Sequence, residues 1–388
     1  MIASLTRILG PAQLGLAEDA VQEALVRALE LWPFQGIPEN PQAWLMTVAR
    51  NRALDFLRRE KLLETKAGLI AQSFAAGAPG HNQFADDRLA MMFLCCHPAL
   101  ARDVRVALTL KSVTGFGVAE IARAFLTPAP TIAQRLVRAK RLLRDESIVF
   151  AMPAGQELED RLDSVLEVIY LIFNEGYLAH SGEALIRKDL CDEAIFLGRL
   201  IADNPLTRSP RCHALLALML LASARLASRQ DALGKVLLFE QQDRAQWDHT
   251  SIALGMLHLE FAAQGEQETE YHLEAAIAAS HYAEPVDWPF IVVHYDRLLE
   301  LKQSPVVMMN RAVAVAKMDG PEAGIRLLEE VEDHPRMRGY YLLPAVIAEL
   351  YIQAGDRDKA RLYLGEALAC ECTVPERRRL ESRMASLA

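Results

Sequence analysis

The sequence predicts an all-α protein with two small helical domains, a linker between them and a larger C-terminal domain of repeated helices. Through most of the 388 residues, apolar side chains recur every three or four positions, the spacing of one helix face. No convincing run of alternating apolar and polar residues predicts a β-strand. Short turns rich in Gly, Pro, Asn and Asp separate the helical stretches.

The first domain is expected over residues 1–62. A helix over 17–32 has small or apolar residues at helical spacing and an acidic pair in its first turn, where the helix dipole favours it. Prolines and a glycine in 33–41 (PFQGIPENP) interrupt the pattern. Asn40 is a suitable N-cap for a second helix over about 42–60, with proline at its first position.

The next segments predict a linker and a second domain. Residues 63–85 lose the helical period and gain Gly, Ala and Pro, which is typical of an exposed linker. The second domain is expected over 86–148, with helices at 103–113, 117–126 and 131–145.

The third domain is expected over 157–388, where helical stretches of roughly 12–18 residues alternate with short turns. Two stretches, 313–328 and 345–367, share a helix–turn–helix outline with small residues near the turn, and 190–205 resembles the second helix of such a unit. Units of this kind stack on their neighbours and bury the remaining apolar faces.

Composition excludes several classes of protein. Hydrophobic residues make up 52% of the chain and charged residues 24%, which is ordinary for a globular protein. The sequence shows neither an uninterrupted apolar run long enough to span a membrane nor a secretory signal pattern. Six cysteines do not form a disulfide framework, so we expect a cytosolic protein.

The net charge of −9 is divided unequally. Residues 1–150 carry 18 Lys and Arg against 14 Asp and Glu, whereas residues 151–388 carry 24 against 37. Nucleic-acid binding depends on the local potential, so the acidic whole does not exclude it. The acidic part is expected to meet a basic partner or the basic first part, with an ordinary solvated surface as the alternative.

The most informative motif lies in residues 115–144. A short helix with small residues (VAEIA) precedes a break (LTPAP) and a helix that has five basic residues and no acidic one between positions 131 and 144. This is the outline of a helix–turn–helix, whose second helix enters the major groove. The alternative is a solvated basic helix. Gln suits adenine and Arg suits guanine. The residues expected at base edges are Thr131, Gln134 and Arg135, and those expected at phosphates are Arg138, Lys140 and Arg141.

The expected helix 41–60 combines an aromatic residue with arginines. Trp44 shares a face with Leu45 and Val48, and four arginines follow within ten positions. Such a combination suits nucleic acid whose bases can unstack, with a core position as the alternative for Trp44.

These motifs together resemble the extracytoplasmic-function (ECF) sigma factors of bacterial RNA polymerase. DAVQE at 19–23, WLMTVARNRALDFLRR at 44–59 and EIA at 120–122 before the basic helix have the order and spacing of region two and region four. The segments LAMMFLCCHPAL, TIAQRLVRAKRLLR, LIFNEGYLA and SPVVMMNRAVAV are similar to an ECF subgroup with a C-terminal tetratricopeptide-repeat-like domain. The resemblance therefore covers essentially the whole chain. One departure is the short first helix, MIASLTRIL.

The resemblance implies a role for each matched residue. Contact with the coiled coil of the β′ subunit of core polymerase is implied for Asp19, Gln22 and Glu23. The segment 33–41 matches the loop that captures a flipped −10 base. Melting and reading of the −10 element are implied for Trp44, Arg50, Asn51, Arg52, Arg58 and Arg59. Reading of the −35 element is implied for Thr131, Gln134, Arg135 and Arg138, with Lys140 and Arg141 beside them.

The resemblance implies that the fused C-terminal domain controls the factor. Within it, IYLIFNEGY at 169–177 lines a groove for a ligand or partner, or forms a buried turn of the core. The cysteine clusters at 95–97 and 370–372 lack a second pair at zinc-site spacing and are expected in the core. The sequence has no phosphate loop, GxSxG or HExxH motif, so we expect no enzyme and no cofactor.

Two functions of other classes stay open beside a sigma factor with core polymerase and promoter DNA as partners. One is a helical-repeat adaptor without promoter function, and the other is a one-component repressor that binds palindromic DNA as a dimer. An exposed, DNA-compatible placement of Arg58, Arg59, Arg135 and Arg138 would favour the sigma factor.

Overall fold

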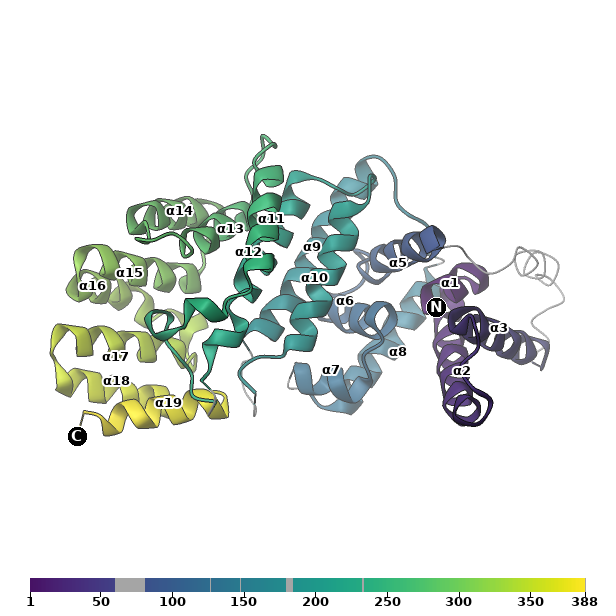
Figure 1. Cartoon of the computed structure of the whole chain (residues 1–388), viewed down its shortest axis with the longest axis horizontal. Coiled ribbons are helices and arrows are strands. Elements are labelled where there is room, and N and C mark those ends of the chain that lie inside the picture. The colour runs from purple at the N-terminus through teal and green to yellow at the C-terminus, as the bar shows by residue number, and fades with distance from the viewer. Residues whose placement is uncertain (60–80, 126, 147, 179–183, 232–233, 388) are drawn as a thin grey trace. The chain divides into compact units, whose positions relative to one another are not determined.

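The computed structural model describes residues 1–59, 81–125, 127–146, 148–178, 184–231 and 234–387 (Figure 1). These residues form helices and turns, with an isolated β-bridge between Gln230 and Val236, so the all-α class is confirmed. The chain divides into two compact units, Met1–Leu171 and Ile172–Ala388. We call them the first and the second unit and describe each by itself. None of the described helices is both long and apolar enough to cross a membrane.

The first unit begins with a bundle of three helices: α1 (Ile2–Leu9), α2 (Leu14–Gln35) and α3 (Pro41–Arg59). Its core joins the fully buried Leu5 to alanines of α2 and α3, whose small side chains let the helices approach closely. The expected cap of α3 is confirmed, because the side chain of Asn40 accepts the Ala43 N–H at 2.9 Å.

Helix α2 ends later than expected. Pro33 lies inside it, and the helix continues to Gln35. A proline in the last turn removes only one helical hydrogen bond, so the helix tolerates it there. Gly36 ends the helix with φ of 82°, a conformation that glycine adopts without strain.

The second domain of this unit consists of α5 (His81–Cys95), α6 (Arg102–Thr109), a π-turn (Leu110–Thr114), α7 (Val118–Ala124) and α8 (Ala129–Asp145). Every residue from Leu89 to Cys96 is buried, so α5 is the central helix of this domain. Most of the expected linker lies outside the described residues, and its last five positions belong to α5.

Helix α9 (Gln156–Tyr177) crosses the boundary between the units. Its first part packs on the helix–turn–helix domain, where Arg161 donates to the Phe93 carbonyl at 2.6 Å and Arg105 donates to Ser164 Oγ at 3.0 Å. Its last part contains Glu175, which is buried and lies 3.3 Å from Arg187. A Cβ on Gly176 would lie 2.8 Å from the Arg187 carbonyl oxygen, so this stretch is packed core rather than a groove.

The second unit is a succession of helices in which most chain neighbours pack on one another (Figure 1). Its helices are α10 (Lys188–Asp203), α11 (Pro210–Ser223), α12 (His249–Ala262), α13 (Glu270–Ser280), α14 (Trp288–Leu301), α15 (Pro305–Asp319), α16 (Pro321–Glu332), α17 (Leu342–Ala354), α18 (Arg357–Ala369) and α19 (Val374–Ala385). The expected helix–turn–helix outlines correspond to the pairs α15–α16 and α17–α18, and residues 190–203 lie in α10.

Small residues set the spacing within these pairs. A Cβ on Gly324 of α16 would lie 2.6 Å from the Ala316 Cβ and 2.9 Å from the Ala312 carbonyl oxygen of α15. Only glycine fits there without a shift of backbone. The pair α17–α18 turns at Gly355, whose φ is 86°.

The cysteines pack as small apolar residues. Cys95, Cys96, Cys191, Cys212 and Cys372 are buried, and burial raises the pKa of the Cys96 thiol to about 12. Among the described residues no group of His, Cys, Asp and Glu is arranged to hold a metal ion.

Candidate nucleic-acid interface

Helices α7 and α8 form the helix–turn–helix that the sequence predicts. The side chain of Glu120 accepts the Gly117 N–H at 2.5 Å and fixes the start of α7. Helix α8 buries one face through Ile132, Leu136 and Leu143, which lie at helical spacing. The opposite face of α8 is free to project from the domain.

The projecting face of α8 carries four exposed residues at helical spacing, and these are Gln134, Val137, Arg138 and Arg141. Arg141 also lies 3.2 Å from Asp145 in its own last turn. Val137, whose side chain is 66% exposed, was not among the sequence candidates. Its place three residues after Gln134 could have indicated that the two side chains share one face of the helix. An apolar side chain on such a face suits the methyl group of thymine.

Two other candidates on α8 are less exposed. Arg135 is half-buried and its Nε lies 3.2 Å from Asp103 of α6. Thr131 is also half-buried, at the start of the helix. Both lie beside the projecting face, and the Asp103 ion pair would have to open before Arg135 could reach a base.

Lys140 lies away from the projecting face. Its ammonium is 2.5 Å from the carboxylate of Glu18 on α2, and Glu18 also accepts the Ser112 hydroxyl at 2.7 Å. Glu18 is only 3% exposed, so these contacts join the first helical bundle to the helix–turn–helix domain. The structure therefore does not place Lys140 with the residues expected at phosphates, because a step of two residues turns the side chain to the other side of the helix.

Helix α2 presents a second exposed surface. Asp19, Gln22 and Glu23 are all exposed, as a contact with a partner requires. Leu29 on the same helix is 77% exposed, and Leu25 and Val26 are exposed as well. These apolar residues were missed by the sequence candidates, although they lie opposite the buried alanines of α2. An exposed apolar strip beside polar residues is typical of a protein–protein contact.

The basic residues of α3 divide between exposed and half-buried positions. Asn51, Arg58 and Arg59 are exposed, and Arg58 lies 3.6 Å from Asp55. Trp44, Arg50 and Arg52 are half-buried. Arg52 forms an ion pair with Glu23 of α2, so a residue expected at DNA contacts one expected at polymerase.

Trp44 is positioned by a second tryptophan. Its ring meets the edge of Trp32 with 5.5 Å between the ring centroids. Phe34 in the last turn of α2 and Ile37 in the loop that follows are both exposed, within the segment expected to capture a base. Three of the four arginines that discriminate between the functions are therefore exposed, and the fourth, Arg135, is half-buried.

Three family models match the chain. Sigma-70 region 2 matches residues 3–62 and sigma-70 region 4 matches residues 90–143. A family of unknown function (DUF6596) matches residues 161–263. Sigma factor domains belong to a non-enzymatic family.

Two relatives extend this result. An uncharacterized protein of Rhizobium meliloti (strain 1021) is 37% identical over 97% of this chain and 90% of its own length. The ECF RNA polymerase sigma factor EcfG of Rhodopseudomonas palustris (strain TIE-1) is 33% identical over 33% of this chain and 68% of its own length. No solved structure matches the chain significantly. The chain therefore belongs to the ECF sigma factors, with sigma-70 regions 2 and 4 followed by a C-terminal DUF6596 domain.

Proposed function

We propose that this chain recruits core RNA polymerase to promoters by reading a −35 element with α8 and a −10 element with α3, and that it helps to open the duplex. The exposed face of α8, with Gln134, Val137, Arg138 and Arg141, carries the proposal. It combines an amide, an apolar group and cations at the spacing of one helix face, which suits base edges flanked by phosphates.

The proposed assignment to the −35 element keeps Thr131, Gln134, Arg135 and Arg138, with Arg141 at a phosphate. Val137 joins this set because it is exposed between two of them. Lys140 would join only after its ion pair with Glu18 opens.

The proposed −10 site consists of Trp44, Arg50, Asn51, Arg52, Arg58 and Arg59 with the exposed loop before α3. Holding a base outside the duplex stack costs a few kcal/mol, and aromatic and cationic side chains can offset that cost. The ring of Trp44, the exposed Phe34 and the arginines of α3 supply both kinds of group.

The proposed polymerase contact is the exposed face of α2. Asp19, Gln22 and Glu23 would supply the polar contacts, and Leu25, Val26 and Leu29 the buried apolar area. The coiled coil of the β′ subunit is the proposed partner, with further contacts to β.

The proposed domain limits are 1–62 for region 2, 63–85 for the linker, 86–148 for region 4 and 157–388 for the C-terminal domain. We propose that the last is a tetratricopeptide-like repeat domain that controls the other two. The small-residue packing of α15 on α16 and the glycine turn between α17 and α18 support this proposal.

Capture of bacterial core RNA polymerase by the full-length chain tests the proposal. Leu29→Ala should weaken capture at least tenfold, because it removes exposed apolar area from the α2 face. Leu206→Ala, which removes a leucine of the second unit that is also mostly exposed, should leave capture unchanged. Equal capture by both variants would contradict the assigned surface. No capture by the folded wild-type chain would favour an adaptor or a repressor.

A further inference from the structure

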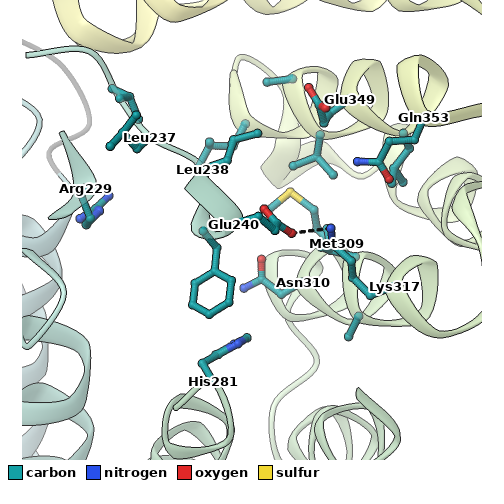
Figure 2. A pocket seen from close by; sticks show the side chains of 18 of the residues that line it. Arg229, Leu237, Leu238, Glu240, His281, Met309, Asn310, Lys317, Glu349 and Gln353 are labelled. Carbon is teal, nitrogen blue, oxygen red and sulfur yellow. Dashed lines mark hydrogen bonds and ion pairs between the residues drawn. The ribbon is translucent and has the colours of Figure 1, made fainter. Parts of the chain in front are cut away.

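A groove of about 450 Å³ opens on the second unit (Figure 2). Helices α14, α15, α17 and α19 supply one part of its lining, and residues 236–240 of the segment between α11 and α12 supply another. These residues are distant in sequence, and none of them belongs to the polymerase or promoter sites proposed above.

Two helices line the groove with regularly spaced side chains. Helix α15 contributes Asn310, Val313 and Lys317, and α17 contributes Val346 and Gln353, among others. The side-chain amides of Asn310 and Gln353 are exposed and have no hydrogen-bond partner among the described residues. An amide side chain both donates and accepts, as the backbone of a bound peptide requires. The groove therefore combines apolar lining with groups that suit a peptide main chain.

The chain's own residues Leu237–Glu240 line part of this groove, and Phe239–Gln241 form a 3₁₀ turn there. The Phe239 ring lies 5.0 Å from the Arg225 guanidinium and 5.1 Å from the His281 ring, measured between centres. The Glu240 carboxylate accepts the Lys317 ammonium at 2.5 Å, and Figure 2 shows this pair across the groove. The aromatic ring and the carboxylate are thus each matched by groups of the surrounding structure.

Within the described part of the chain, side chains alone attach this segment to the helices that line the groove. The backbone hydrogen bonds of residues 237–242 are local or run to Arg229, and among the described residues none reaches α14, α15 or α17. The Lys317–Glu240 pair is partly exposed, with side chains 31% and 53% accessible. An exposed pair contributes little to stability, so a competing peptide can replace it.

The contacts of Phe239 and Glu240 also indicate which residues a competing peptide would need. The site of Phe239 suits an aromatic ring, because the Arg225 guanidinium lies over the ring and the His281 ring packs against it. Burial and the nearby Arg225 lower the pKa of His281 to about 4, so its ring is neutral near pH 7. Lys317 provides the positive charge that a carboxylate at the Glu240 position pairs with. The matching occupant is a short segment that forms a turn, as Phe239–Gln241 do, and that has an apolar residue, an aromatic residue and then an acidic one.

We propose that the second unit binds such a segment of a partner protein in this groove, and that Leu237–Glu240 holds the place until the partner displaces it. The inference rests on the proposed control function of the second unit for its purpose in the cell. The binding itself can be measured independently of transcription.

Fluorescence anisotropy with a labelled VLLFEQQ peptide, the sequence of residues 236–242, tests the proposal on the full-length chain. The variant Phe239→Ala/Glu240→Ala removes the ring and the carboxylate from the groove, and we call it the emptied variant. It should bind the peptide at least tenfold more tightly than the wild type. Glu240→Gln, a milder change, should give a smaller gain of about threefold. Adding Lys317→Glu to the emptied variant should remove at least tenfold, whereas Arg357→Glu on the far helix α18 should not.

Several results would overturn the proposal. One is the absence of peptide binding by both the folded Phe239→Ala/Glu240→Ala variant and the folded Glu240→Gln variant. Another is equal affinity of the wild type and the emptied variant. A third is an affinity that Lys317→Glu does not change. Circular dichroism and melting of each variant establish that it is folded. Capture of core polymerase by the same variants reports separately on the sigma function, so failure of one proposal is distinguishable from failure of the other.

Discussion

The two units use similar helices but direct their functional side chains differently. In the first unit, the exposed candidate residues, such as Glu23, Arg59 and Arg138, project outward from α2, α3 and α8. In the second unit, side chains of several helices converge on a groove that a distant segment of the same chain partly fills. An outward face can be recognised from one helix, whereas a groove exists only after distant segments have folded together.

The two units also differ in whether their cationic side chains form ion pairs. Arg138 and Arg59 of the first unit are exposed, with no ion pair among the described contacts. Two cations at the groove of the second unit are paired, Lys317 with Glu240 and Arg379 with Glu376 at 2.8 Å. Unpaired cations suit a polyanion such as DNA, and paired ones suit exchange between similar carboxylates.

The largest expected effect is a loss of stability when the small core of the first unit is altered. Leu5→Ala removes a fully buried side chain from the first bundle and should cost about 3 kcal/mol of unfolding free energy. Leu29→Ala should change stability by less than about 0.5 kcal/mol, because Leu29 lies on the surface. Urea unfolding of both variants measures the difference. Equal costs would mean that α1 does not contribute to this core.

The outward face of α8 is tested by two arginines with different expected roles. Arg135→Ala should relax the preference at one −35 position and cost about 1–3 kcal/mol of binding. Arg138→Ala should weaken all promoters alike and lower the salt slope by about one. Binding of polymerase holoenzyme to promoter variants over a salt series separates them. An unchanged −35 preference, or an unchanged slope, would contradict the respective role.

Packing within the second unit is tested by two glycines. Gly324→Ala should destabilise the unit by about 1–2 kcal/mol, since its Cβ would lie 2.6 Å from the Ala316 Cβ. Gly365→Ala on α18 should instead stabilise by about 0.5–1 kcal/mol, because a Cβ there meets nothing within 4 Å and alanine favours the helix. Thermal unfolding of the pair measures both signs. The same sign in both variants would contradict the close packing of α15 on α16.

The smallest expected effect concerns pH at the groove. The pKa of His281 is lowered to about 4, so below its ordinary value of 6.5 the unfolded chain binds a proton that the folded chain does not. Its contribution to stability is therefore present above pH 6.5 and is lost as the pH falls toward 4. Between pH 6.5 and 5.5 the loss should be about 1 kcal/mol.

Comparison with His281→Gln isolates this contribution, because other histidines of the second unit, including His213 and His258, also have lowered pKa values. The variant should lose less stability than the wild type over the same interval. An identical pH dependence of the two proteins would contradict a neutral, buried His281.

Local sequence patterns were sufficient for much of the fold. The cap at Asn40, the break before α8 and the glycine turn at Gly355 are set by neighbouring residues, so they could be predicted. Pro33 misled the prediction of the α2 end, because its cost depends on how close it lies to the helix terminus.

Contacts between distant residues could not be predicted in this way. Helical periodicity places Lys140 on a different side of α8 from Arg138, but it does not indicate that its partner is Glu18, 122 positions away. The Lys317–Glu240 contact joins residues 77 positions apart, one of them in an irregular segment. Such contacts follow from how helices pack, which periodicity does not encode.

Run-off transcription tests the central claim most directly. Core RNA polymerase, the full-length chain and fragments of the source genome should give transcripts that begin at discrete sites. Arg138→Ala should reduce all of these transcripts together, and core polymerase alone should give none at those sites. The claim would be contradicted if the folded chain produced no specific transcripts, or if it bound duplex DNA as a dimer without recruiting polymerase.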